Sequence, residues 1–127
     1  MHLYHDLILD HYRNPRNSGS LEDATHQADV KNPTCGDTLH MDIRVNRGNI
    51  ADIRFTGSGC AISQASASLL SEYIRGKSLA EALALDTSTA LKLLGVTLSP
   101  GRLKCGLLAL EALKRSLNNT NKRSATS

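Results

Sequence analysis

The chain has 127 residues, a formal net charge of +3 and 40% hydrophobic residues, which suffices for one domain with its own core. Aromatic residues make up only 3%, too few for the stacking surfaces that bind single-stranded nucleic acid, so we expect no nucleic-acid partner. No run of about 18 apolar residues occurs, which predicts no membrane span. The N-terminus lacks the pattern of a secretory signal, and the three cysteines are too few for a disulfide scaffold; both favour a cytoplasmic protein.

The N-terminal part of the chain predicts a helix, a loop and an edge strand. Residues 2–13 place apolar side chains near helical spacing, and Asn14-Pro15 is a typical stop signal. His5 and His11 do not share a face of this helix, so we interpret them as exposed or capping side chains rather than metal ligands. Residues 14–24 have the composition of a loop, and residues 25–33 are expected to form an irregular edge strand.

The clearest strand signal lies in residues 38–56. The segment "TLHMDIRV" alternates apolar and polar residues, "NRGN" is typical of a turn, and "IADIRF" continues as a strand. We therefore expect an antiparallel hairpin with one polar face.

The second half of the chain predicts four helices. Residues 62–75 are rich in small side chains, with Ser63 as the expected N-cap. Ser78 and Glu81 predict a capping box at the start of the next helix. The remaining helices are expected at 87–94, ended by Gly95, and from Ser99-Pro100 to about residue 117. The domain should thus span residues 1–117, and residues 118–127 are expected to be a disordered tail.

The three cysteines lie at junctions between predicted elements. They are Cys35 in "NPTCGD", Cys60 in "GSGCAIS" and Cys105 in "SPGRLKCG". A structural cysteine usually sits inside an apolar stripe, so this placement favours a chemical role. Helix N-termini stabilise negative charge and hence the thiolate, which both metal ligation and sulfur transfer require. Glycines beside Cys35 and Cys60 should let an inorganic centre approach the backbone.

Together with Asp37, the three thiolates form a set of four ligands. Zinc accepts such sulfur and oxygen ligands tetrahedrally. A stable iron–sulfur cluster usually has four cysteine ligands, so a carboxylate in place of one thiolate should make a cluster easier to release. Release suits a protein that builds a cluster and hands it over.

Two other classes of function remain open from these residues. A cysteine hydrolase would need a histidine base, and His26 and His40 are the nearest candidates in sequence. A structural zinc domain would use the same ligands, and would unfold when the metal is removed.

Several segments resemble one known family when taken in order. They are "HYRNPRN", "NPTCGD", "GSGCAISQASAS", "GKSLAEA" and "RLKCGLLALEAL". They are similar to the U-type iron–sulfur cluster assembly scaffold proteins, the group of IscU, SufU and the NifU N-terminal domain. The resemblance covers about residues 2–117. It implies an α+β fold, SufE/NifU-like, in which a small antiparallel three-stranded sheet packs against helices.

The resemblance also implies a site and partners. Cys35, Asp37, Cys60 and Cys105 match the ligands of a metal or an iron–sulfur cluster. A pyridoxal-phosphate cysteine desulfurase would deliver persulfide sulfur, and iron–sulfur acceptor or carrier proteins would receive the cluster. Cys35 would accept the sulfur in a SufU-like mechanism, and Cys105 in an IscU-like one. A scaffold is expected rather than a catalyst, as a monomer or weak dimer.

Departures from the IscU branch leave the occupant of the site open. Lys104 stands where that branch has a histidine, and "LSPGRLK" replaces its chaperone-binding Leu-Pro-Pro-Val-Lys segment. The residues before Cys105 resemble SufU, whose members bind zinc and accept sulfur, but the inserted segment usual in that branch is missing. A zinc-bound sulfurtransferase shuttle that stimulates its desulfurase is therefore the alternative. Arg102 and Lys104 are interpreted either as auxiliary groups that steer anionic sulfur or as solvated charges.

Overall fold

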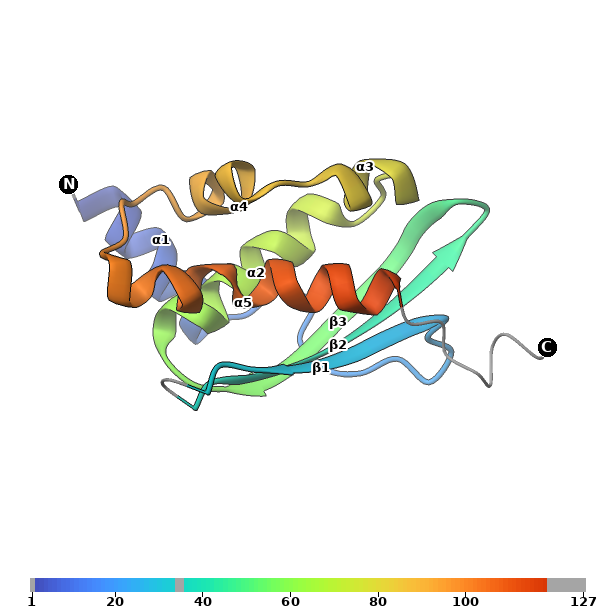
Figure 1. Cartoon of the computed structure of the whole chain (residues 1–127), viewed down its shortest axis with the longest axis horizontal. Coiled ribbons are helices and arrows are strands. Elements are labelled where there is room, and N and C mark those ends of the chain that lie inside the picture. Colours follow the sequence, from blue (N-terminus) through green and yellow to red (C-terminus); the bar gives the residue numbers. More distant parts are fainter. Residues whose placement is uncertain (1, 34–35, 119–127) are drawn as a thin grey trace.

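The computed structural model describes residues 2–33 and 36–118 (Figure 1). Its elements follow the predicted order, with small shifts at the boundaries. They are α1 (His2–Arg13), β1 (His26–Lys31), β2 (Thr38–Asn46), β3 (Asn49–Ser58), α2 (Ala61–Ile74), α3 (Leu79–Ala84), α4 (Thr87–Leu94) and α5 (Pro100–Leu117). None of the described helices is long and apolar enough to cross a membrane.

The strands form one antiparallel sheet in the order β1-β2-β3, so the expected edge strand and hairpin are both confirmed. Arg47 and Gly48 connect β2 to β3 with φ values of 54° and 78°. Two successive positive φ values are typical of the tight turns that match the twist of a hairpin. The register pairs Thr38 with Ser58, which brings the start of β2 beside the end of β3.

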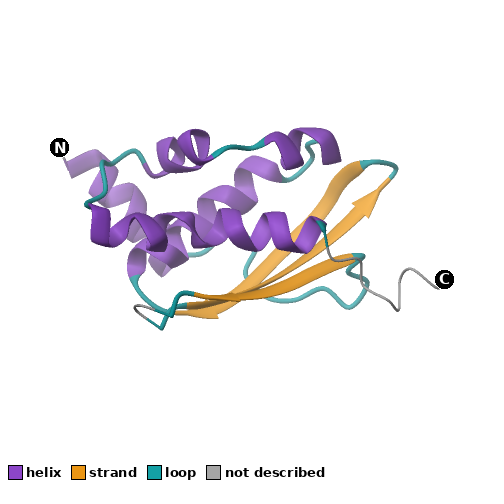
Figure 2. Cartoon of the chain, in the orientation of Figure 1, coloured by secondary structure: helices purple, strands orange, loops and turns teal. Residues whose placement is uncertain are grey.

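The helices cover one face of the sheet (Figure 2), which confirms the predicted α+β class. α5 packs against β1 and β2, α2 packs against β3 and α5, and α4 lies on the side of α2 and α5 away from the sheet. The core between sheet and helices is aliphatic apart from Phe55; its fully buried members include Met41, Ile43, Ile53, Leu70, Ile74 and Leu113. Burial of these side chains is the main stabilising contribution to the fold.

The opposite face of the sheet is more covered than the expected polar face. Asp42 points away from the aliphatic core, yet it is only 3% exposed. Its carboxylate accepts hydrogen bonds from the Leu21 amide and from His40. The loop after α1 folds across this face, which alternation along one strand does not reveal.

The predicted caps are confirmed at two helices and wrong at a third. Ser78 and Glu81 form the capping box of α3, and Gly95 ends α4 in the left-handed conformation. Ser63 does not cap α2, because Cys60 occupies the N-cap position. The Ser63 hydroxyl lies in the first turn and donates to the Cys60 carbonyl at 3.1 Å.

The interpretation of His11 as an exposed side chain is also wrong. α1 packs along α2, and His11 is only 3% exposed between them. Its Nδ1 lies 2.7 Å from the Ser68 hydroxyl, which also accepts a hydrogen bond from the Arg16 amide. Burial holds the pKa of His11 below its ordinary value, because an imidazolium is poorly solvated there.

Candidate metal centre

Three separate segments bring Asp37, Cys60 and Cys105 together. One ligand atom from each side chain lies within 4.8 Å of those of the other two. Asp37 directly precedes β2, and Cys60 follows β3 as the N-cap of α2. The hairpin register therefore places these two side by side, and α5 adds Cys105 from its second turn. This cluster, Asp37, Cys60 and Cys105, is called the thiol site below.

Asp37 and Cys60 contact each other directly. One carboxylate oxygen of Asp37 accepts the Cys60 amide at 3.1 Å, and the other accepts the Cys60 thiol at 3.3 Å. Asp37 is 3% exposed, so these contacts hold a buried carboxylate with both oxygens facing a donor. A carboxylate held in this way is preorganised to share a cation with the adjacent sulfur.

Two glycines make this approach possible, for different reasons. A Cβ at Gly59 would lie 2.3 Å from the Asp37 carboxylate, and the φ of Gly59 is +146°. A Cβ at Gly57 would lie 2.3 Å from the Thr38 carbonyl on the neighbouring strand. Gly59 thus clears room for the Asp37 side chain, whereas the sequence predicted room for an inorganic centre; Gly57 clears room for strand pairing.

Cys105 is set by the packing of α5 on α2. Its side chain is buried, with 4% exposure. The next residue, Gly106, accepts a hydrogen bond from the buried Ser66 hydroxyl at 2.9 Å. A Cβ at Gly106 would lie 2.5 Å from the Leu98 side chain, so α5 and the chain before it also pack closely here. These contacts fix the depth and rotation of the turn that presents Cys105.

The thiol site opens into a pocket of about 530 Å³. Gly101 and Arg102, from the first turn of α5, complete its lining. Arg102 is exposed and lies at the site, as its auxiliary interpretation requires. Lys104 instead lines a separate hollow of about 500 Å³ between α5 and the end of β1. Cys35, the fourth predicted ligand, lies outside the described residues, and its role remains a prediction.

The histidines expected for a cysteine hydrolase have other partners. The two ring nitrogens of His40 each lie 2.7 Å from a carboxylate, that of Asp29 and that of Asp42. The His26 ring bonds the Thr25 hydroxyl. Over the described part of the chain, the thiol site is the one group of three or more potential metal ligands, and it contains no histidine. Neither of the two histidines expected for a cysteine hydrolase, His26 and His40, is therefore found as a base at the thiol site.

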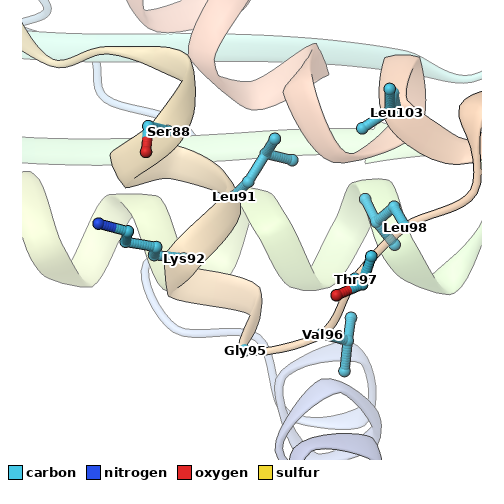
Figure 3. A pocket seen from close by; sticks show the side chains of 8 residues that line it. All are labelled: Ser88, Leu91, Lys92, Gly95, Val96, Thr97, Leu98 and Leu103. Carbon is cyan, nitrogen blue, oxygen red and sulfur yellow. The ribbon is translucent and has the colours of Figure 1, made fainter.

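A third hollow, of about 450 Å³, lies between α4 and the start of α5 (Figure 3). Leu91, Leu98 and Leu103 line it from three different segments, and Lys92 is its one charged side chain. Its lining combines aliphatic side chains with Ser88, Lys92 and Thr97 and offers no set of metal ligands. The chemistry of the described residues is therefore concentrated at the thiol site.

A family model described as the NifU-like N terminal domain matches residues 3–127. The chain belongs to this family. It is 36% identical to the zinc-dependent sulfurtransferase SufU of Bacillus subtilis, over 91% of this chain and 89% of that protein. It is 38% identical to the iron–sulfur cluster assembly scaffold protein IscU 1 of Archaeoglobus fulgidus, over 91% of this chain and 74% of that one.

The fold is likewise that of known family members. The crystal structure of a nitrogen-fixing NifU-like protein (N-terminal) from Brucella abortus superimposes with a TM-score of 0.72. The match covers 91% of this chain and 92% of that one at 21% identity. The resemblance inferred from the sequence motifs is confirmed.

Proposed function

We propose that this protein is an iron–sulfur cluster assembly scaffold. It accepts persulfide sulfur from a cysteine desulfurase, holds iron and sulfide as cargo, and passes the cluster to acceptor proteins. The observation that carries the proposal is the convergence of Asp37, Cys60 and Cys105 within 4.8 Å at an open pocket. Cys35 would supply the fourth ligand.

The donor set fits transient binding better than permanent storage. Thiolates are soft ligands that hold iron strongly, whereas a carboxylate is a harder ligand. Asp37 also contacts Cys60 directly, so protein groups hold its carboxylate in place. The buried hydrophobic residues other than Cys105 form a core that needs no metal. This favours a scaffold over a structural zinc domain, which folds only around its metal.

Sulfur transfer needs one ionised thiol of this chain and a persulfide on the donor. The thiolate attacks the terminal sulfur of the persulfide, a new S–S bond forms, and the donor S–S bond breaks. The electron pair leaves with the cysteine sulfur of the donor, so the step involves no net oxidation. Cys35 and Cys105 are the proposed acceptors. Arg102 lines the pocket of Cys105, where its guanidinium would stabilise an anionic sulfur.

A zinc-dependent sulfurtransferase is the second candidate, favoured by the similarity to the Bacillus subtilis protein over most of both chains. The same residues, Cys35, Asp37, Cys60 and Cys105, would hold the zinc ion. Zinc would keep the thiols deprotonated at neutral pH. In that case the protein would stimulate its desulfurase and pass sulfur on without building a cluster.

Anaerobic reconstitution separates the two candidates. The protein is incubated with cysteine, ferrous iron, dithiothreitol and the cysteine desulfurase encoded in the same genome, and visible absorption and desulfurase turnover are followed. Dithiothreitol supplies the two electrons that convert persulfide sulfur into the sulfide of a cluster. A scaffold develops a cluster chromophore that transfers to an apo-ferredoxin, and Cys60→Ser abolishes it. Stimulated turnover without a chromophore would contradict the scaffold and support the zinc-dependent shuttle.

A further inference from the structure

Two exposed lysines line the hollow between α5 and the end of β1. Lys31 ends β1, and Lys104 lies on the first turns of α5. Among the described residues, neither forms an ion pair, whereas Arg115 in the same hollow is paired with Glu111 at 2.8 Å. Lys31 and Lys104 therefore contribute positive charge that no described acid neutralises. The hollow between them, about 500 Å³, is called the β1–α5 groove below.

The β1–α5 groove also has apolar lining. Pro33, Leu107 and Leu108 line it together with the two lysines, Asn32 and the Glu111–Arg115 pair. Apolar lining beside these two lysines is complementary to a segment that carries acidic residues around an aliphatic side chain.

The β1 edge is also the unpaired edge of the sheet. On the opposite edge, Ser18 bridges to Phe55 and Ser78 bridges to Asn49, so β3 is partly covered. Within the residues that the structure describes, β1 pairs with β2 alone. An edge strand of this kind offers main-chain groups to an extended segment of a partner. Such a segment would end beside Asn32, whose amide donates a hydrogen bond to the carbonyl of Asp37, a proposed ligand, at 2.8 Å.

We propose that the β1–α5 groove docks an acidic, extended segment of the sulfur-donating cysteine desulfurase, with Lys31 and Lys104 as its charged contacts. The inference rests on the proposed function and names the surface that positions the donor. The donor is assigned to this groove by position: a segment along β1 ends next to Asp37 and therefore beside the thiols that must receive the sulfur.

Charge reversal tests the groove. We expect the double variant Lys31→Glu/Lys104→Glu to weaken binding to the desulfurase from the same organism at least about tenfold at low salt. The affinity of Lys31→Met/Lys104→Met for the desulfurase should lie between those of the charge-reversed variant and the wild type. Its Kd should also depend less on salt than that of the wild type. Lys92→Glu is the control for a charge reversal elsewhere, because Lys92 is exposed on α4 and does not line the groove. It should alter Kd less than about twofold. Thermal melts establish that each variant is folded.

Two further measurements make the outcome decisive. Zinc and iron binding by each variant alone should match the wild type, because neither lysine lines the thiol pocket. The proposed docking role is overturned if the Lys31→Glu/Lys104→Glu variant binds the desulfurase as tightly as the wild type. It is also overturned if Lys92→Glu loses as much affinity as that double variant. Loss of cluster transfer to apo-ferredoxin with unchanged desulfurase affinity assigns the groove to the acceptor and also overturns it. A wild-type protein that takes no sulfur from the desulfurase would refute the proposed function instead.

Discussion

The two ends of the sheet are held by different kinds of contact. At the hairpin turn, Arg47 and Gly48 lead into β3, and the Ser78–Glu81 capping box stands beside it. The decisive hydrogen bonds of that cap span only three residues. At the other end, Asp37 meets Cys60 across 23 residues of chain, and Cys105 arrives from a third segment.

The two kinds of contact should respond differently to substitution. Replacing one residue of a local cap typically lowers the free energy of unfolding by only about 1 kcal/mol. The thiol site depends on the close approach of the Gly59 backbone to the Asp37 carboxylate, which a single added carbon atom obstructs. We therefore expect the largest losses from small substitutions at the thiol end, and smaller ones at the turn end.

The largest effect is expected for Gly59→Ala. The added Cβ would collide with the Asp37 carboxylate, and the φ of +146° strains any side chain. We expect about 2–4 kcal/mol of lost stability together with lost metal binding. Urea unfolding and titration with zinc measure both.

Gly48→Ala is the matched control for Gly59→Ala. Gly48 also has a positive φ, of 78°, but an added Cβ meets nothing within 4 Å. The cost should be about 1–2 kcal/mol, with zinc affinity unchanged. Equal losses in the two variants would show that backbone strain alone, and not the contact with Asp37, makes Gly59 necessary.

A smaller effect is expected where α5 packs on the preceding segment. In Gly106→Ala the new Cβ would press on the Leu98 side chain, which can shift in part, so we expect about 1–3 kcal/mol of destabilisation. Because Cys105 is the adjacent residue, zinc affinity should fall as well. Gly101→Ala, in open space on the same helix, should be neutral or stabilising. A destabilised Gly106→Ala protein with wild-type zinc affinity would separate α5 packing from the position of Cys105.

At the turn end, Ser78→Ala should lower stability by about 1 kcal/mol, because the Glu81 amide loses its acceptor. Zinc binding should not change. Ser99 is the N-cap of α5 but makes no side-chain cap hydrogen bond, so Ser99→Ala should have a smaller effect on denaturant midpoints. If Ser78→Ala also weakened zinc binding, the hairpin-turn end of the sheet would influence the thiol site at the other end, contrary to the comparison above.

The smallest effects concern two histidines whose pKa values shift in opposite directions. Burial disfavours the charged form of His40, but hydrogen bonds to Asp29 and Asp42 outweigh it and raise the pKa above 6.5. The protonated ring therefore binds more strongly in the folded state, and this stabilisation is lost as pH rises through the folded pKa. For His11, burial lowers the pKa below 6.5, so stability falls as pH drops from 6.5 through the folded pKa.

Urea unfolding between about pH 5 and 8 measures both contributions. In the wild type, His40 causes stability to fall as pH rises above 6.5, and this fall should be absent in His40→Gln. His11 causes stability to fall as pH drops below 6.5, and this fall should be absent in His11→Gln. If both histidines changed the slope of stability against pH in the same direction, the opposite pKa shifts assigned to them would be contradicted.

Local patterns were sufficient wherever the deciding contact lies within a few residues. The Ser78–Glu81 box, the end of α4 at Gly95 and the alternation in β2 were all predicted correctly. The same rules failed for Ser63, whose cap position is taken by Cys60, and for His11 and Asp42, which are buried by segments distant in sequence. Periodicity identifies one face of an element but not what covers the other face.

Motifs and spacing were enough to predict the family, the order of the elements and the residue types of the thiol site, because they are properties of the chain. The contacts of the site required the fold. Asp37 bonds both the amide and the thiol of Cys60, and Gly59 leaves room for that carboxylate. Arg102 lines the thiol pocket, whereas Lys104 lines the β1–α5 groove. Side-chain direction around a helix start depends on how the helix is rotated against its neighbours. That rotation is fixed by packing between residues far apart in sequence.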